Sequence, residues 1–210
     1  MEQPRVGVII VAGGSGKRMG GTLPKQFSFV GGQPILARTI NAFRKALPTS
    51  RIVVVLPAEY VEFWKNFSAR FEVAKHSVVE GGEERFHSVR NGIEALSDAV
   101  DLIAVQDGVR PFASKEMILR VVDCATKFGA AIPVVKAVDS YRAVEGEESH
   151  IIDRTPLRIV QTPQIFSASI LRAAYDTAFR KEFTDDASVV EAMGHPVSGV
   201  EGNRENIKLT

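Results

Sequence analysis

The stretch Val6-Gly7-Val8-Ile9-Ile10-Val11-Ala12-Gly13-Gly14 joins a short apolar run to the start of a glycine-rich segment. A continuous apolar run is typical of a strand buried on both faces, as in a parallel sheet that is covered by helices. Runs of this kind recur four times, with a segment long enough for a helix between successive runs: Ile52–Leu56, Val73–Val79, Leu102–Val105 and Ala130–Val135. This alternation predicts an α/β fold with a doubly wound, mostly parallel sheet.

Amphipathic helices are predicted between these strands. Ligands of a doubly wound sheet bind beyond the carboxyl ends of its strands, so the residues that directly follow each strand are the first candidates for a functional site. Apolar residues recur at helical spacings of three and four in three segments and should cover both faces of the sheet: Ile35, Leu36, Ile40, Phe43 and Leu47; Val89, Ile93 and Leu96; Ile118, Val121, Val122 and Ala125.

The composition is that of one globular domain spanning residues 1–210. The chain is 45% hydrophobic and 24% charged, and its 210 residues suit a single core. A net charge of +1 provides no overall field to recruit nucleic acid or a membrane surface, so neither is expected as a partner. The longest apolar run near the N-terminus is far shorter than the roughly 20 residues of a membrane span, and a cytoplasmic location is expected.

Cysteine and histidine provide no pattern typical of a metal site. The single Cys124 excludes an internal disulfide, a CxxC redox pair and a multi-cysteine zinc site, and it is expected to be a small buried hydrophobe. The ligands of any metal therefore stay unknown. Structural or surface roles are expected for the four histidines, which lack metal-ligand spacing: His76, His87, His150 and His195.

The pattern changes after Val135. Two extended pieces, Ala137–Val144 and His150–Arg154, flank the polar turn Glu145–Ser149 and predict a projecting hairpin arm over about residues 137–156. A hairpin without a core of its own is marginal in water. We therefore expect the arm to pack on a second subunit, which makes a homodimer.

The glycine-rich segment after the first strand is the strongest local signal. Glycines let backbone N–H groups approach phosphate oxygens closely, and Lys17, Arg18 and Lys25 can neutralise those oxygens. The segment is not a P-loop, because Gly16-Lys17 is followed by Arg18 rather than Ser or Thr. It fits a dinucleotide-binding fingerprint poorly, because Gly20 comes one position late. A plain flexible turn is the alternative.

Gln106-Asp107-Gly108-Val109-Arg110-Pro111 closes the fourth strand. A carboxylate and a guanidinium at this edge can hold a sugar hydroxyl and a phosphate. Asp107 could also serve Mg²⁺, although one carboxylate is a minimal site. An internal ion pair between Asp107 and Arg110 is the structural alternative.

Four further motifs are weaker, because a turn or a helix cap explains each of them about as well as ligand binding does. Acidic residues favour a helix N-terminus, and Thr or Asp is common at an N-cap. These motifs are Glu80–Arg85, ahead of a helix expected to begin near Phe86, then Asp153–Pro156, Gln161–Gln164 and Thr184–Asp186, which opens a helical stretch.

Taken together, the motifs resemble the 2-C-methyl-D-erythritol 4-phosphate cytidylyltransferases of the non-mevalonate isoprenoid pathway. AGGSGKRM, LPKQF, GGEERFHSV, QDGVRP, DRTP, QTPQIF, TDDAS and VEGNRENIK occur in the family's order and approximate spacing over nearly the whole chain. The resemblance implies a Rossmann-like nucleotidyltransferase fold. It further implies transfer of CMP from CTP to 2-C-methyl-D-erythritol 4-phosphate, release of pyrophosphate, and Mg²⁺ or another divalent cation as cofactor.

The resemblance also implies roles for individual residues, several of which would come from the arm of a partner subunit. The implied catalytic residues are Arg18, Lys25, Arg154 and Lys208. The nucleotide would be bound by Ala12, Gly13, Gly14, Gly16, Gly82, Glu83 and Ser88. The methylerythritol phosphate would be held by Asp107, Arg110, Ser140 and Thr184.

Three departures from the family pattern bear on these roles. Bacterial members often have His-Asp-Ala-Ala-Arg-Pro where this chain has residues 106–111, and Ser140 stands where Thr is common. Neither change removes a charge. Family members also usually continue for about one more helix beyond Lys208. Lys208 is therefore expected to be ordered only if its strand is paired in the sheet.

Three other functions remain open from the sequence. Ribitol 5-phosphate cytidylyltransferase is the nearest, because both acceptors are phosphorylated polyols and the nucleotide loop is nearly the same. An NAD-dependent oxidoreductase would agree with the strand-helix pattern and the glycine-rich turn alone. A non-catalytic nucleotide-binding module would leave five charged residues at the predicted site without a role: Arg18, Lys25, Asp107, Arg110 and Arg154.

Overall fold

The computed structural model describes residues 3–13, 24–97 and 99–209. Four parallel strands form one half of the central sheet, in the order β5, β4, β1, β6. Their alternating side chains point to opposite faces, so that Val8 and Ile10 join one apolar cluster and Ile9 joins the other. The strands are β1 (Val6–Val11), β4 (Arg51–Leu56), β5 (Ser77–Glu80) and β6 (Leu102–Asp107).

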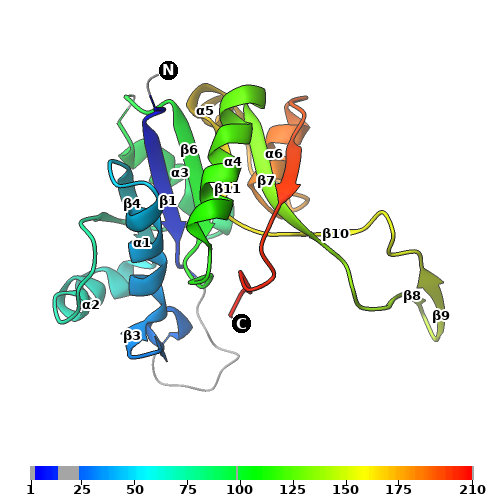
Figure 1. The fold of residues 1–210 in the computed structure, drawn as a ribbon, viewed down its shortest axis with the longest axis horizontal. Coiled ribbons are helices and arrows are strands. Elements are labelled where there is room, and N and C mark those ends of the chain that lie inside the picture. Colours follow the sequence, from blue (N-terminus) through cyan, green and yellow to red (C-terminus); the bar gives the residue numbers. More distant parts are fainter. Residues whose placement is uncertain (1–2, 14–23, 98, 210) are drawn as a thin grey trace.

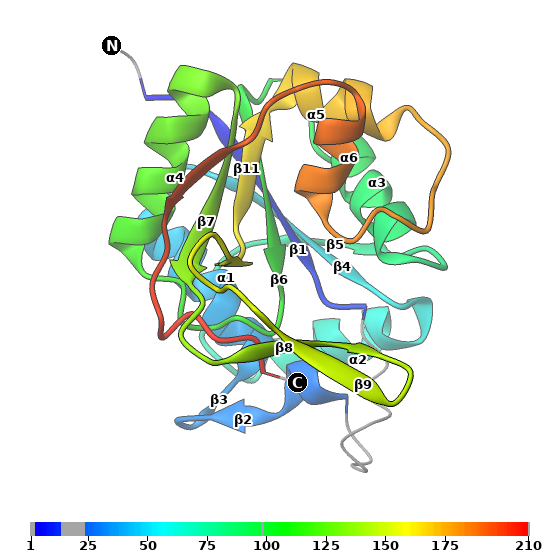
Figure 2. The ribbon, with the colours of Figure 1, turned by 90° about the vertical axis from the view of Figure 1, so that its right-hand side faces the viewer.

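The other half of the sheet is mixed. One stretch of chain runs antiparallel along β7, first as β10 and then as β11, and β11 also pairs with β6. β12 pairs with β7 in parallel. Figures 1 and 2 show these strands extending the sheet beyond β6. The strands are β7 (Ala130–Lys136), β10 (Arg158–Val160), β11 (Gln164–Ser167) and β12 (Ser198–Glu201).

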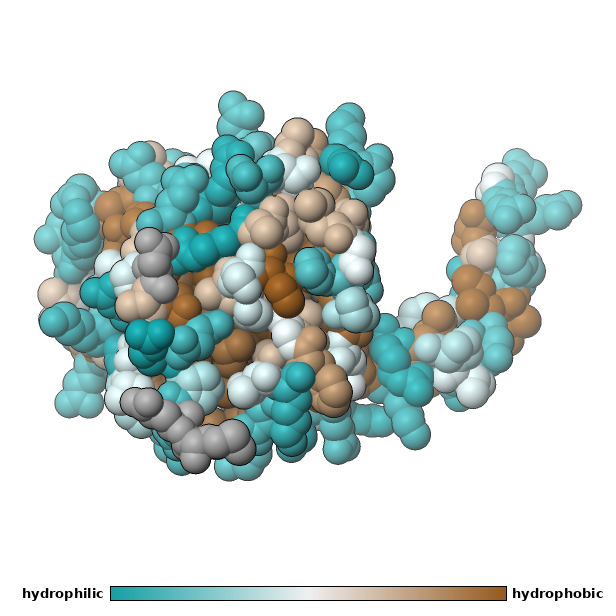
Figure 3. Space-filling model, turned by 90° about the horizontal axis from the view of Figure 1, so that it is seen from above, coloured by the Kyte–Doolittle hydropathy of each residue, from teal (hydrophilic) through white to brown (hydrophobic). Residues whose placement is uncertain are grey.

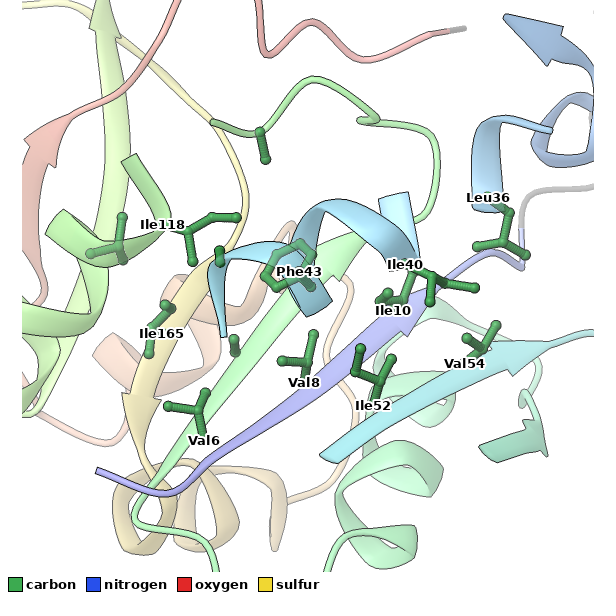
Figure 4. Packing of buried hydrophobic residues seen from close by; sticks show 14 of the residues in the cluster. Val6, Val8, Ile10, Leu36, Ile40, Phe43, Ile52, Val54, Ile118 and Ile165 are labelled. Atoms are coloured by element: carbon green, nitrogen blue, oxygen red, sulfur yellow. The ribbon is translucent and has the colours of Figure 1, made fainter. Parts of the chain in front are cut away.

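Helices cover both faces of the sheet, as a doubly wound fold requires. On one face α1, α2 and α4 pack over a cluster that includes Val8, Ile40 and Phe43 (Figure 4). On the other face α3, α5 and α6 pack over Ile9 and Ile103. No helix in the described ranges is long and apolar enough to cross a membrane. The helices are α1 (Ile35–Ala46), α2 (Ala58–Ser68), α3 (Arg85–Ala95), α4 (Lys115–Phe128), α5 (Ala168–Tyr175) and α6 (Asp186–Ala192).

Short elements follow the segment 14–23, which lies outside the described residues. The 3₁₀ helix η2 (Lys25–Phe27) leads into the strand pair β2 (Phe29–Val30) and β3 (Gln33–Pro34). Phe27 of η2 is fully buried and its ring contacts the aromatic side chains of α2. This packing fixes the position of Lys25 relative to the sheet.

Residues 141–152 form an antiparallel hairpin, β8 (Tyr141–Glu145) and β9 (Glu148–Ile152), whose strands pair with each other and with no other described strand. Figures 1 and 3 show this arm standing away from the body of the molecule. Gly146 makes the tight turn with a φ of 63°. Val144 and Ile151 are 70% and 71% exposed, so the arm presents apolar surface to solvent in the single chain.

The structure corrects several boundaries that the sequence predicts. The third strand begins at Ser77 rather than Val73, because side chains of α1 hold the backbone ahead of it. Asn41 bonds the Ala74 N–H at 2.8 Å, and Arg44 donates to the Lys75 carbonyl at 3.0 Å. The first hairpin strand is shorter than predicted, the second begins and ends two residues earlier than predicted, and the turn between them is tighter. Cys124 is half-buried against the core rather than fully buried.

Neighbouring residues of α4 test the contribution of the core. Ile118 is 0% exposed and Leu119 is 36% exposed. We expect Ile118→Ala to lower the free energy of unfolding by about 2–5 kcal/mol, because it leaves a cavity in the close-packed layer between α4 and the sheet. Leu119→Ala should cost less than about 1 kcal/mol. Urea unfolding followed by circular dichroism measures both, and equal losses would contradict the assigned orientation of α4.

Candidate active site

The carboxyl ends of β1, β4, β5 and β6 lie at one edge of the sheet, where backbone hydrogen bonds hold the segments that follow them. The Ala12 N–H donates to the Val55 carbonyl at 2.9 Å, and the Gly108 N–H donates to the Val11 carbonyl at 2.8 Å. A Cβ on Gly108 would lie 2.8 Å from the Ala12 Cβ. Only glycine therefore allows the loop after β6 to approach the end of β1 so closely.

The loop between β5 and α3 faces the end of β1. The Gly82 N–H donates to the Ser88 Oγ at 3.1 Å, which ties this loop to the first turn of α3. A Cβ on Gly13 would lie 3.9 Å from the same Oγ, so the structure brings Gly13, Gly82 and Ser88 together. Glu83 is exposed beside them. The predicted start of this helix near Phe86 is confirmed, because α3 begins at Arg85.

Lys25 lies at the same edge. Its neighbour Gln26 is buried and donates from Nε2 to the Ala12 carbonyl at 2.9 Å. This bond attaches η2 to the end of β1 and places Lys25 near the predicted nucleotide loop. The predicted site residues Gly14, Gly16 and Arg18 lie outside the described residues.

Asp107, at the end of β6, is the centre of a charged cluster. Its Oδ2 lies 3.2 Å from the Arg110 Nε and 3.0 Å from the Lys208 Nζ. Its Oδ1 lies 3.9 Å from the Arg85 Nε. The residue is 8% exposed, so these charges act through little water. The internal Asp107–Arg110 pair considered from the sequence is therefore present, but it is one contact of a larger group.

The cluster sets the ionisation of Asp107. Burial of the carboxyl works against its charge, but the charges of Arg85, Lys208 and Arg110, with the hydrogen bond from Lys208, outweigh burial and hold the pKa of Asp107 below its usual value. Asp107 is therefore an anion throughout the neutral range. An ionised carboxylate accepts hydrogen bonds and donates none, which suits it to bind hydroxyl groups.

Neutral carboxamide, hydroxyl and carbonyl groups hydrogen-bond to the backbone and side chains of this cluster. The Thr162 Oγ1 accepts from the Asp107 N–H at 3.1 Å, and Gln106 donates to the Arg110 carbonyl at 3.0 Å. Arg110 donates to the Asn206 carbonyl at 2.8 Å, and Asn206 donates to the Thr162 carbonyl at 2.8 Å. The QTPQIF and VEGNRENIK motifs thus include supports for Asp107, a role that the sequence did not reveal.

Lys208 contacts Asp107 although the residues around it do not form a strand. The segment around it forms no strand, contrary to the condition expected from the sequence, yet the Leu209 N–H donates to the Val109 carbonyl at 3.0 Å. That bond, with the contact to Asp107, fixes the segment against the loop after β6. Lys208 and Asp107 are brought together across 101 positions of sequence.

Thr184 is exposed and directly precedes the start of α6, where Asp185 is the N-cap and forms a capping box with Ser188. The helix cap that the sequence offered as the alternative to ligand binding for this motif is therefore present. Buried Gln164 donates to the Asp185 Oδ2 at 2.8 Å and accepts from the Ala187 N–H at 2.9 Å. These contacts place the α6 N-terminus beside β11.

Ser140 and Arg154 are not brought to this edge by their own chain. Ser140 directly precedes β8 and Arg154 follows β9, so both belong to the arm, which Figure 1 shows away from the strand ends. Both residues are exposed, and Arg154 donates to the carbonyl of Val138 within the arm. The site of one chain therefore contains Asp107, Arg110 and Lys208 without Ser140 and Arg154.

The chain is similar to proteins of known family. A family model described as 2-C-methyl-D-erythritol 4-phosphate cytidylyltransferase matches residues 6–210. The protein of that name from Bacteroides thetaiotaomicron is 51% identical over 204 residues, which cover 97% of this chain and 93% of the relative. The crystal structure of that enzyme from Thermus thermophilus is 37% identical, has a TM-score of 0.79, and is matched over 98% of this chain and 93% of that one.

A pH series tests the charged cluster. We expect Asp107→Asn to lower the free energy of unfolding at pH 7, because three cations then lose their shared anion. A depressed pKa stabilises the fold above the unfolded value and loses that effect as pH falls through the folded value. The difference between wild type and variant should thus be constant above about pH 5 and shrink below about pH 3.8.

Urea unfolding at several pH values measures this difference, with Asp123→Asn on the exposed face of α4 as the matched control. A difference that does not change between pH 7 and pH 3 would contradict the assignment of a depressed pKa to Asp107.

Proposed function

Because the chain belongs to the 2-C-methyl-D-erythritol 4-phosphate cytidylyltransferase family, we propose that the cluster around Asp107 and the loops beside it form its active site. The enzyme transfers CMP from CTP to 2-C-methyl-D-erythritol 4-phosphate and releases pyrophosphate, in isoprenoid precursor biosynthesis. One observation carries the proposal. A buried carboxylate faced by three cations lies at the strand edge where such sheets bind ligands.

The nucleotide half of the site is the pair of loops after β1 and β5. We assign the cytosine ring to Gly82, Glu83 and Ser88, whose backbone groups and hydroxyl can pair with the amide-like edge of a base. We assign the phosphates to Ala12 and Gly13, which continue this surface, and to Gly14 and Gly16, which lie outside the described residues. Glycine at these positions lets backbone N–H groups approach an anion closely.

The acceptor half of the site is the Asp107 cluster. Asp107 is an anion with acceptor capacity only, so it pairs with the hydroxyl groups of the erythritol. Arg110 and Lys208 provide positive charge beside it for the acceptor's phosphate. Thr184, exposed ahead of α6, adds a hydroxyl that can donate or accept.

The chemical step needs charge and alignment rather than a side-chain nucleophile. The acceptor's phosphate oxygen attacks the α-phosphorus of CTP, the new P–O bond forms, and the bond to pyrophosphate breaks. A phosphate monoester has a second pKa of about 6 and is already largely dianionic at pH 7, so no general base is required. Arg18 and Lys25 then stabilise the charge that grows on the α-phosphate.

We propose that Mg²⁺ or another divalent cation enters with CTP rather than binding to a cage of side chains. In the described part of the chain, no group of three or more His, Cys, Asp or Glu residues is placed to hold a metal ion. Asp107 faces three cations, so a divalent ion at its carboxylate would be repelled. Mg²⁺ commonly takes its oxygens from substrate phosphates, and when bound it neutralises part of their charge.

We further propose that the enzyme works as a homodimer whose arms complete each other's sites. Ser140 and Arg154 lie on the arm, which stands away from the end of β6 in the same chain (Figure 1). The apolar exposed residues Val144 and Ile151 suit the arm to contact a second subunit. A C2 dimer formed this way would give each site one partner arm. The use of CTP agrees with a cytoplasmic location.

Ribitol 5-phosphate remains the acceptor to exclude, because it too is a phosphorylated polyol. The family match and the names of the relatives favour methylerythritol phosphate. The same findings favour a transferase over the oxidoreductase considered from the sequence.

Lys25→Ala tests the proposed catalysis. We expect it to lower turnover by roughly 10²–10³, equal to about 3–4 kcal/mol of lost transition-state stabilisation, because one charge donor to the α-phosphate is removed. Far-UV circular dichroism should stay native. The assay is pyrophosphate release from CTP and Mg²⁺ with methylerythritol 4-phosphate, with ribitol 5-phosphate, or with no acceptor, and Lys127→Ala on exposed α4 is the control.

Wild-type release with methylerythritol phosphate alone supports the proposed acceptor, while release with ribitol phosphate alone would change it. Near-normal turnover of Lys25→Ala would remove Lys25 from the mechanism.

The arm has its own test. Wild-type protein should scatter light as a dimer at micromolar concentration, and the double substitution Val144→Asp with Ile151→Asp should scatter as a monomer, because two charges replace apolar contact surface. Turnover should fall with the dimer, since each site loses its partner arm. Phe128→Asp, an exposed apolar residue of α4, is the matched control and should remain dimeric. A monomeric wild type would refute the shared site.

A further inference from the structure

We propose that Arg85, Asp186 and Tyr175 form a positioning unit that leaves one oxygen of Asp107 free for the hydroxyl groups of the acceptor. This inference rests on the proposed function, in which Asp107 binds the methylerythritol phosphate. None of the three residues is placed in contact with substrate here. Their effect on the reaction would pass through Asp107.

The Arg85 guanidinium forms a bidentate ion pair with Asp186. Its Nη1 donates to the Asp186 Oδ1 at 2.9 Å and its Nη2 donates to the Asp186 Oδ2 at 2.6 Å. This bidentate pairing fixes the plane of the guanidinium more firmly than a single bond would. Asp186 is 0% exposed, so the pair is anchored within the fold rather than at the surface.

Tyr175 fixes the Asp186 end of this pair. Its hydroxyl donates to the Asp186 Oδ1 at 2.6 Å, and its ring stacks on Phe86, the neighbour of Arg85. Burial and then the charge of Asp186 raise the pKa of Tyr175 well above its ordinary value, so the hydroxyl keeps its proton. Burial works against the charge of Arg85, but Asp186 and then Asp107 outweigh it and raise the pKa of Arg85.

The geometry gives the two oxygens of Asp107 different surroundings. Oδ2 is contacted by the Arg110 Nε at 3.2 Å and by the Lys208 Nζ at 3.0 Å. Oδ1 lies 3.9 Å from the Arg85 Nε, which is too long for a hydrogen bond. Among the described residues, Oδ1 therefore has a cation beside it and accepts no hydrogen bond. Its lone pairs are available to a ligand.

The bidentate pairing with Asp186 keeps the Arg85 Nε 3.9 Å from the Asp107 Oδ1. Without that pairing, the Arg85 guanidinium could turn and donate an N–H to the nearest other carboxylate, which is Asp107. It would then occupy the oxygen that the acceptor needs. The pair also links Arg85, at the start of α3, to the α6 N-terminus that follows Thr184. Asp186 thus bears on acceptor binding more than on nucleotide binding.

Steady-state kinetics with both substrates tests this unit. Asp186→Asn keeps the shape of the side chain but weakens its bidentate pairing with Arg85. We expect this substitution to raise the KM for methylerythritol 4-phosphate by about tenfold. The KM for CTP should stay within about twofold, because the Gly82–Ser88 contact is untouched. Asp176→Asn, exposed and one residue after Tyr175, is the matched control.

A second substitution separates positioning from general structural damage. Adding Arg85→Gln to Asp186→Asn removes the freed cation and leaves a neutral pair, so the acceptor KM should recover by at least about threefold. A purely structural role predicts no recovery and similar changes in both KM values. That result, or an unchanged acceptor KM in folded Asp186→Asn, would overturn the proposal.

If Asp186→Asn does not fold, Tyr175→Phe decides instead. It removes one hydrogen bond to Asp186 and should raise the acceptor KM alone, by about two- to fivefold. No change, or an equal change in both KM values, would overturn the proposal. Failure here is distinct from failure of the proposed function, because wild-type enzyme that releases no pyrophosphate with CTP and methylerythritol phosphate would already refute that function.

Discussion

The charge of one buried carboxylate, Asp107, organises this site. A carboxylate with so little exposure loses most of its hydration, and it remains ionised only because Arg85, Arg110 and Lys208 surround it. Each cation comes from a different part of the chain: the start of α3, the loop after β6 and the segment after β12. The carboxylate therefore connects three segments of the chain as well as supplying an acceptor for hydroxyl groups.

Positive charge alone would not keep this arrangement in place, because three cations close together repel one another. Hydrogen bonds from neutral groups hold the cluster in place. Thr162 accepts from the Asp107 backbone, Asn206 accepts from Arg110 and donates to Thr162, and Gln106 closes the loop. These groups add no charge and so leave the ionisation of Asp107 to the cations. The proposed role in binding polyanions requires such neutral supports, since further carboxylates would cancel the positive field of the site.

The fold could be predicted from the sequence because hydrophobic periodicity is local. β1, α1 and α4 follow their apolar patterns closely, whereas β5 is shorter than its pattern because Asn41 and Arg44 bind the preceding backbone. Asp107 could be predicted as a site residue from its place after the fourth strand, and Lys208 by family resemblance, but their contact could not be predicted. The pairing of Arg85 with Asp186 spans 101 positions and depends on how α6 is placed relative to α3, so no local sequence pattern predicts it.

The reaction explains why the site contains charge and hydrogen-bond acceptors and needs no activated nucleophile. The acceptor arrives as a phosphate that is already a nucleophile at neutral pH, so the enzyme must align two polyanions that repel each other. Cations can align the two substrates only if their side chains are held in place and do not form other ion pairs that block the substrates. Asp107 occupies Arg110 and Lys208 before substrate arrives, and Asp186 occupies Arg85. Internal pairing thus orders the cations in advance, and in the proposed site a bound acceptor would exchange contacts within a cluster that is already in place.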